Sequence, residues 1–250
     1  MTVVARALAV AAVVAAAGAL AGCGADRQDA VVAAASDTRD AFAEIADVVR
    51  REDGLEVGFV FGSSGLLREQ LLNGGPYDAY VSASTAYVDE VVEAGVGVAA
   101  TRREYAVGRL AIIAATDAPP PTDPASLVGA RRIVIANPEH APYGVAAREA
   151  LRSLGIDAAL AARTILADNV ADAVRIVDAG EADAGIVALS LVGDRPHLVV
   201  DASLHEPIRQ TMVVTRRGED NAAVRAFVRV LASDEGLAIL ARHGFEPVAP

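Results

Sequence analysis

The sequence has no lysine, no tryptophan and a single cysteine. All 22 basic residues among its 250 are therefore arginine. Without lysine, the chain cannot form a Walker-type phosphate-binding loop or a Schiff base with a carbonyl substrate. The single cysteine, Cys23, excludes an intrachain disulfide and a cysteine metal cluster. Aromatic residues make up only 4% of the chain, so the core has to be built from Ala, Val, Leu and Ile.

Positive charge is scarce as well, and the formal net charge is −11. A surface this acidic repels polyanions. We therefore expect no nucleic-acid partner and no electrostatic attraction to an anionic membrane surface.

The first 22 residues predict an export signal. Arg6 is the only charge before an apolar core at residues 7–21, which is shorter than the roughly 20 residues that span a bilayer. The core ends in Leu-Ala-Gly-Cys at 20–23, which resembles the lipobox of bacterial lipoproteins. The resemblance implies that residues 1–22 form a lipoprotein signal peptide and that Cys23 carries lipid on the outer face of the cell membrane. The alternative is an ordinary buried or unpaired cysteine.

The remaining residues, about 227, are enough for one large domain or two lobes. Short apolar runs of strand length alternate with helical patterns, which predicts an α/β fold with parallel strands buried on both faces. The expected strands lie at residues 30–35, 55–61, 77–83, 109–115, 131–136, 163–167, 184–188, 197–202 and 211–216.

Apolar residues at helical spacing predict the helices. One stripe contains Phe42, Ile45 and Val48, and another contains Leu67 and Leu71. Proline at the start and glycine after the end mark a further helix from Pro142 to Gly155. The remaining helices are expected at 169–179, 219–232 and 234–243.

Four of the strand-to-helix junctions have small or hydroxylic side chains, around Ser36, Ser64, Tyr143 and Val170. In open α/β sheets, ligands bind beyond the carboxyl ends of the strands. A helix N-terminus offers unpaired N–H groups and a partial positive charge, so it favours an anion. If these junctions converge, they can hold an oxyanion even in an acidic protein.

The Ser63-Ser64 pair raises the question of a catalytic nucleophile. A hydrolase elbow has glycine two residues before and two residues after the serine. Ser64 has Gly62 before it but Leu66 after it, and Ser63 has Phe61 before it, so neither serine fits. The histidines show no zinc-type i, i+4 pair, but the base of a triad can be distant in sequence. They are His140, His197, His205 and His243.

Five segments resemble the periplasmic molybdate-binding proteins of ABC transporters, the ModA type, over nearly all of residues 30–248. They are AAASDTRDAF, FGSSGLLREQLLNGGPYDAYVSAS, ANPEHAPYGVAAREAL, DNVADAVRIVDAGEADAGIVA and RHGF. The resemblance implies a two-lobed periplasmic-binding-protein-like fold of type II, with two crossover strands and a cleft between the lobes. We expect one lobe from residues 28–108 and 212–250, and the other from 109–211.

The resemblance also implies which residues bind the ligand. The positions that hold tetrahedral molybdate or tungstate fall on Ser36, Ser64, Tyr143 and the backbone N–H of Val170. Molybdenum would be present only as molybdate at these residues, with no other metal and no cofactor. Some members have a ligand tyrosine where this chain has Ala188, and we infer that the phenol of Tyr143 replaces it.

Asp37 is a further candidate, through its backbone N–H. A carboxylate that faced an oxyanion would repel it. We therefore expect the Asp37 side chain to point to solvent or to cap the helix that follows, while its N–H faces the ligand.

The sequence thus predicts a monomeric, lipid-anchored binding protein outside the cytoplasm, with no catalytic residues. Its expected partners are a membrane permease and, through it, the ATPase subunit of an ABC importer. Three alternatives stay open: a binding protein for another oxyanion such as sulfate or phosphate, a secreted serine hydrolase, and a lipoprotein sensor without a transport partner.

Overall fold

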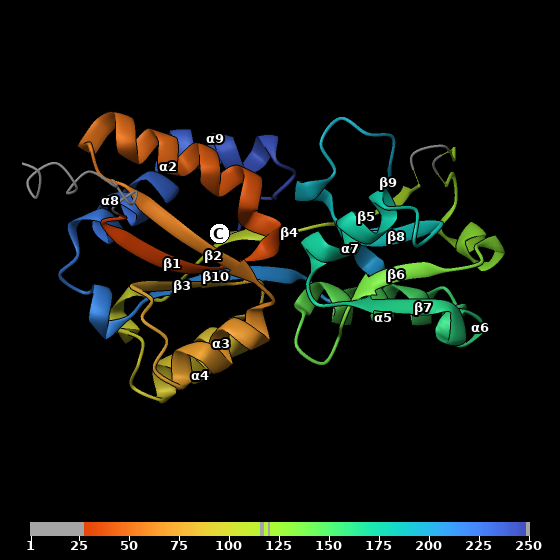
Figure 1. Ribbon diagram of the computed structural model, residues 1–250, viewed down its shortest axis with the longest axis horizontal. Coiled ribbons are helices and arrows are strands. Elements are labelled where there is room, and N and C mark those ends of the chain that lie inside the picture. The colour runs from red at the N-terminus through yellow and green to blue at the C-terminus, as the bar shows by residue number, and fades with distance from the viewer. Residues whose placement is uncertain (1–27, 116–117, 120, 249–250) are drawn as a thin grey trace, which may run out of the picture.

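Two five-stranded sheets form the centres of two α/β lobes, side by side along the long axis of the molecule (Figure 1). The computed structural model describes residues 28–115, 118–119 and 121–248. The predicted signal peptide, residues 1–22, and Cys23 lie outside these residues. Within the described residues, no helix is both long and apolar enough to cross a membrane.

The first sheet has the strand order β2-β1-β3-β10-β4. Its strands are β1 (Ala30–Ala35), β2 (Val57–Gly62), β3 (Ala79–Ser82), β4 (Arg103–Gly108) and β10 (Ile208–Val214). Strand β1 pairs in parallel with β2 and β3, whereas β10 is antiparallel to both β3 and β4.

The second sheet has the order β7-β6-β8-β5-β9. Its strands are β5 (Leu110–Ala114), β6 (Ile133–Ala136), β7 (Thr164–Ala167), β8 (Ala184–Ala188) and β9 (Leu198–Val199). Strand β6 is parallel to β7 and β8, and β5 is antiparallel to β8 and β9.

The sequence suggested a parallel sheet, and both sheets do contain parallel pairs, but each is mixed because antiparallel strands lie beside them. The chain passes from one sheet to the other between β4 and β5, and returns before β10. Neither β5 nor β10 is reached through a helical crossover from a neighbouring parallel strand, so each runs antiparallel to the strands beside it.

The helices cover both faces of each sheet (Figure 1). In the first lobe, α2, α8 and α9 lie on one face and α3 and α4 on the other, whereas α5, α6 and α7 belong to the second lobe. Their bounds are α2 (Arg39–Asp53), α3 (Ser64–Leu72), α4 (Thr85–Glu93), α5 (Pro142–Ser153), α6 (Asp157–Leu160), α7 (Val170–Asp178), α8 (Ala222–Leu231) and α9 (Asp234–Arg242). The sequence patterns missed α4, α6 and β4.

Helix α2 shows how the few aromatic residues are used. Its apolar stripe buries Phe42 and Ile45 completely, and the helix ends at Gly54, which has the left-handed φ of 67° that glycine tolerates. The Phe42 ring lies 5.5 Å from Phe59 on β2 and 5.2 Å from Phe227 on α8, measured between centroids. These rings fix α2 and α8 on the first sheet, and so fix the loop that leads from β1 into α2.

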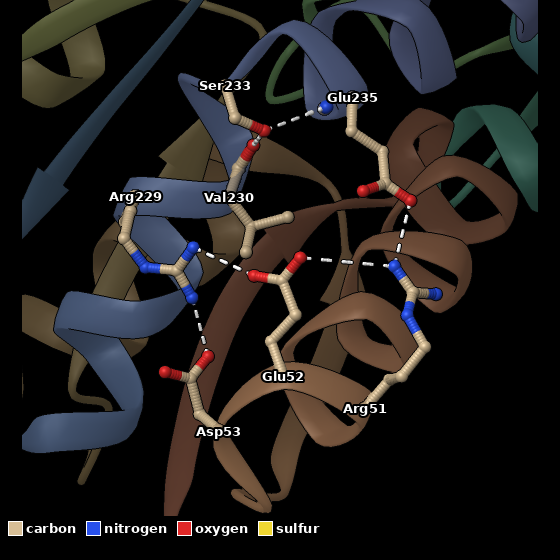
Figure 2. Close-up of polar contacts among 8 residues, drawn as sticks. Arg51, Glu52, Asp53, Arg229, Val230, Ser233 and Glu235 are labelled. Atoms are coloured by element: carbon tan, nitrogen blue, oxygen red, sulfur yellow. Dashed lines mark hydrogen bonds and ion pairs between the residues drawn. The ribbon is translucent and has the colours of Figure 1, made fainter.

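Ion pairs join the outer ends of these helices at the surface (Figure 2). Arg229 of α8 contacts Glu52 at 2.9 Å and Asp53 at 2.6 Å, and Arg51 contacts Glu235 of α9 at 2.9 Å. All five side chains are at least 30% exposed, so each pair contributes only a few tenths of a kcal/mol to about 1 kcal/mol. Apolar packing therefore dominates this contact between helices.

Candidate functional site

A small pocket, with a cavity volume of about 10 Å³, lies where the carboxyl ends of strands from the two lobes meet. The first lobe contributes the ends of β1, β2 and β3, and the second contributes the starts of α5 and α7. All the candidates from the sequence line this pocket, together with neighbouring small residues. The lining residues are Ala35, Ser36, Asp37, Gly62, Ser63, Ser64, Ala83, Ala141, Pro142, Tyr143 and Val170.

Four helical segments begin at the pocket. A single 3-10 turn (Ser36–Thr38) leads into α2, while α3 begins at Ser64, α5 at Pro142 and α7 at Val170. The first N–H groups of a helix have no partner within it, and the helix dipole adds a partial positive charge there. No arginine is among the lining residues. The positive potential in the pocket therefore comes from the N-terminal ends of these helical segments and not from a charged side chain.

The serine hydroxyls differ in what they can still donate. Ser64 Oγ accepts a hydrogen bond from the Ala83 N–H at 3.1 Å, so its own hydrogen is free to donate. Ser36 Oγ accepts a longer bond from the Ala171 N–H, at 3.4 Å, and is free in the same way. Ser63 Oγ, in contrast, donates to the backbone oxygen of His140 at 2.5 Å. Ser36 and Ser64 can therefore donate to a ligand in this conformation, and Ser63 cannot.

The expectation for the Asp37 side chain was wrong. It neither points to solvent nor caps a helix, because it is 1% exposed and α2 has no side-chain cap. Its Oδ2 accepts hydrogen bonds from the Tyr143 hydroxyl at 3.0 Å and from Gln210 Nε2 at 2.7 Å. These two buried donors hold the carboxyl inside the protein.

Burial raises the pKa of Asp37 from 3.8 to about 7, although the hydrogen bonds from Tyr143 and Gln210 act in the opposite direction. Within the described part of the chain, Oδ1 has no hydrogen-bond partner. In a neutral carboxyl, Oδ2 can accept both donors only if the acidic hydrogen is on Oδ1. The group then offers a donor where an ionised carboxylate would repel an anion.

Tyr143 was expected to direct its phenol at the ligand, but here its hydroxyl donates to Asp37. Burial, with the charge of Asp37, raises the pKa of the Tyr143 phenol, so it stays neutral. Gly108, the last residue of β4, leaves room for this phenol: an added Cβ would lie 2.1 Å from Tyr143 Oη. Ala188 is fully buried in β8 and does not line the pocket.

Sequence reasoning missed two polar residues behind the pocket. Gln210 is fully buried in β10, and its Oε1 accepts from the Tyr105 hydroxyl at 3.3 Å. Ser190 follows β8 and donates to the backbone oxygen of Asp37 at 2.7 Å. In the sequence, Gln210 directly precedes the apolar run that was expected to form a strand from residue 211. Its polar side chain next to that run was the only sign that it could have a role.

The site offers little for metal or nucleophilic chemistry. No group of three or more His, Cys, Asp or Glu side chains in the described residues could hold a metal ion. Ser63 Oγ lies 2.8 Å from His140 Nδ1, but Ser63 donates to the His140 carbonyl, and no carboxylate among the described residues hydrogen-bonds to this ring. A catalytic base needs such a group to orient it.

Two α/β lobes with an enclosed pocket of helix N-termini between them define a two-lobed solute-binding protein. The profile of the bacterial extracellular solute-binding proteins matches residues 30–246. The molybdate-binding protein ModA of Azotobacter vinelandii is 31% identical over 233 residues, covering 89% of this chain and 92% of the relative. That of Rhodobacter capsulatus is 30% identical over 221 residues, covering 87% and 88%.

A solved structure agrees. The periplasmic molybdate-binding protein of Azotobacter vinelandii superimposes with a TM-score of 0.81 at 28% identity, covering 88% of this chain and 99% of that one. The sulfate-binding protein SubI of Mycobacterium tuberculosis shares the fold, with a TM-score of 0.70 at 14% identity. The chain belongs to the bacterial extracellular solute-binding protein family and, within it, to the ModA type.

Proposed function

We propose that this protein is the substrate-binding component of an ABC importer and that its ligand is molybdate or tungstate. The observation that carries the proposal is the convergence of four helix starts on one enclosed pocket with no arginine in its lining. Neutral donors suit a fully ionised dianion, because hydrogen bonds to a charged acceptor are the strong ones. The ModA relatives, named for molybdate binding, favour the same ligand.

The ligand would be held by the hydroxyls of Ser36 and Ser64 and by the backbone N–H of Val170. Asp37 would add its backbone N–H and, when neutral, the hydroxyl of its carboxyl group. Tyr143 would act through Asp37, whose carboxyl it orients. Since sulfate has the same charge and shape as molybdate, selection between them would rest on the size of the closed pocket.

We propose that residues 28–108 and 212–250 form one lobe and 109–211 the other, hinged at the two crossings. Support comes from strands β1 to β4, which lie in the first sheet, and from β5 to β9, which form the second. Strand β10 crosses the boundary: it pairs in the first sheet, while Ile208 at its start packs with the core of the second lobe. The ligand-free protein would exchange between open and closed lobes, and ligand would shift this equilibrium toward the closed form. A membrane permease with its ATPase subunit would recognise the closed monomer.

A thermal-shift panel of molybdate, tungstate, sulfate and phosphate tests the ligand. A ligand that binds only the folded protein stabilises it by about 2.7 kcal/mol at a concentration of 100 Kd. Molybdate and tungstate should raise the Tm, and sulfate and phosphate should leave it unchanged. A Tm raised by sulfate or phosphate alone would assign the pocket to that oxyanion. An esterase activity lost in Ser63→Ala would instead favour a hydrolase.

We also propose that Cys23 becomes the lipid-bearing N-terminus of the exported protein. One acyl chain binds a membrane only marginally, so stable anchoring needs the several chains of a bacterial lipoprotein. Cys23→Ser should release the protein from the membrane fraction or leave it unprocessed. The same fractionation and mass as the parent would contradict the anchor. Purification of the parent without any permease would favour a sensor.

A further inference from the structure

The loop before α5 touches the start of α3 at the rim of the pocket, and so joins the two lobes. His140 lies in this loop, and Ser63 and Gly65 lie at the start of α3. Ser63 Oγ is 2.8 Å from His140 Nδ1 and 2.5 Å from the His140 backbone oxygen, and the Gly65 N–H donates to the same oxygen at 2.9 Å. His140 does not line the pocket.

The three hydrogen bonds are mutually compatible. The Ser63 hydroxyl hydrogen goes to the His140 carbonyl, which leaves Ser63 Oγ as an acceptor for an N–H on Nδ1 of the same histidine. The second lone pair of the carbonyl accepts the Gly65 N–H. His140 of the second lobe is therefore hydrogen-bonded to two residues of the first lobe, Ser63 and Gly65.

Glycine at position 65 is explained by this contact and not by backbone conformation. Gly65 lies in the first turn of α3 and is not among the glycines with positive φ, so alanine would suit the helix better. However, a Cβ at Gly65 would lie 2.7 Å from the His140 backbone oxygen and 3.0 Å from its Cα. These are backbone atoms, so they cannot turn away as a flexible side chain would.

We propose that Ser63, Gly65 and His140 form a latch that keeps the lobes closed and sets how long the bound ligand stays. Neither His140 nor Gly65 needs to touch the ligand for this. The ligand-binding candidates are at most 3% exposed, so a ligand can leave only when the lobes separate and these three bonds break. Because apparent affinity scales with the closed fraction, weakening the latch lowers affinity and raises the dissociation rate.

Gly65→Ala and His140→Ala test the latch in the full chain, with Gly129→Ala and His197→Ala as matched controls. Gly129 has open space where a Cβ would lie, and His197 is an exposed histidine outside the contact. Removing one neutral hydrogen bond corresponds to about a 2- to 10-fold change, so we expect that increase in the molybdate dissociation rate for His140→Ala. Gly65→Ala, which disturbs all three bonds, should exceed 10-fold. Tyrosine fluorescence in stopped-flow displacement by tungstate measures both.

Stability separates a latch from a merely structural contact. Gly65→Ala should unfold at the same urea concentration as the parent or a higher one, because alanine favours the helix, while it binds ligand more weakly. An unchanged dissociation rate in both variants would overturn the latch. So would loss of affinity that merely tracks loss of stability.

The use of molybdate as probe rests on the proposed function, so a second readout does without ligand. Amide hydrogen exchange of the ligand-free protein should show slower exchange over residues 63–66 in the parent than in His140→Ala. Small-angle scattering should show a larger radius of gyration in Gly65→Ala. Equal exchange and equal radius would overturn the latch even if molybdate binds. A parent that binds none of the oxyanions but shows these differences would refute the ligand assignment alone.

Discussion

The Tyr143 hydroxyl donates a 3.0 Å hydrogen bond to Asp37 Oδ2, across the boundary between the lobes. Tyr143 lies at the start of α5 in the second lobe, and Asp37 follows β1 in the first. Because Gln210 donates to the same oxygen, the other carboxyl oxygen is left for a ligand. Ligand binding, lobe closure and the protonation of Asp37 should therefore depend on one another.

Molybdate affinity should fall with rising pH, and Asp37→Asn should remove this dependence. With a pKa of about 7, the carboxyl is neutral below that pH and ionised above it, where it repels the dianion. The affinity should be constant up to about pH 7 and then fall by as much as tenfold per pH unit. Titration calorimetry from pH 5 to 9 measures the slope, with the exposed Asp201→Asn as control. A parent with flat affinity over this range would contradict a proton-linked Asp37.

The stability of the ligand-free protein should decrease as the pH rises from about 4 to about 7. Burial raises the Asp37 pKa in the folded state above its ordinary value of 3.8, so between about pH 4 and pH 7 the folded state holds a proton that the unfolded state has lost. This contribution is fully present below about pH 4 and is lost as the pH approaches 7; a shift of about three units corresponds to about 4 kcal/mol. Urea unfolding at several pH values should show a slope that Asp37→Asn reduces.

Tyr143→Phe distinguishes a phenol that binds the ligand from one that orients Asp37. The hydrogen bond from Tyr143 lowers the pKa of Asp37, so its loss should move the midpoint of the pH dependence upward. We expect affinity at pH 6 to fall by less than about tenfold, the effect of one neutral hydrogen bond. A loss of 10- to 150-fold with an unchanged midpoint would mean that the phenol turns to the ligand, as the sequence suggested.

Ser64→Ala should weaken molybdate binding by about 10- to 150-fold, because a hydrogen bond to a charged group contributes roughly 1.5–3 kcal/mol. Ser64 keeps a free hydroxyl hydrogen, since its oxygen accepts from the Ala83 N–H. Titration calorimetry with the exposed Ser203→Ala as control measures the effect. Parent-like affinity in Ser64→Ala would remove this serine from the site.

Gly108→Ala should displace the two side chains, Tyr143 and Gln210, that hold Asp37 in the pocket. The new Cβ would lie 2.1 Å from Tyr143 Oη and 3.0 Å from Gln210 Nε2, so the two donors to Asp37 would have to move. We expect weaker ligand binding and a lower Tm, since overpacking typically costs about 1–3 kcal/mol. Gly129→Ala is the control. Unchanged Tm and affinity would show that the crossing between the lobes adjusts freely.

The sequence predicted most of the fold because its elements are marked locally. Proline and glycine bound α5, and Asn169 caps α7 by accepting from the N–H groups of Ala171 and Asp172. The junctions at Ser36 and Ser64 could be recognised in the same way. Strand β4, from Arg103 to Gly108, was missed because its polar residues interrupt the apolar pattern of a strand. Its partner, β10, lies far along the chain, so no local signal marks the pairing.

The environment of Asp37 could not be predicted for a related reason. Whether a carboxyl turns to solvent or inward depends on which donors face it. Here these are Tyr143, 106 residues away, and Gln210, 173 residues away. No local pattern brings them together; only the closed arrangement of two lobes does.

Strand β10 also has a consequence for the order in which the protein can fold. It lies between β3 and β4, yet 99 residues, 109–207, separate it from β4 along the chain. The first lobe to begin synthesis is therefore the last to be completed, because β4 has no neighbour in its sheet until β10 arrives. The other lobe is continuous and can form while the ribosome is still adding α8 and α9. Until then, β3 is an edge strand with unpaired backbone groups, and such an edge can pair with another chain.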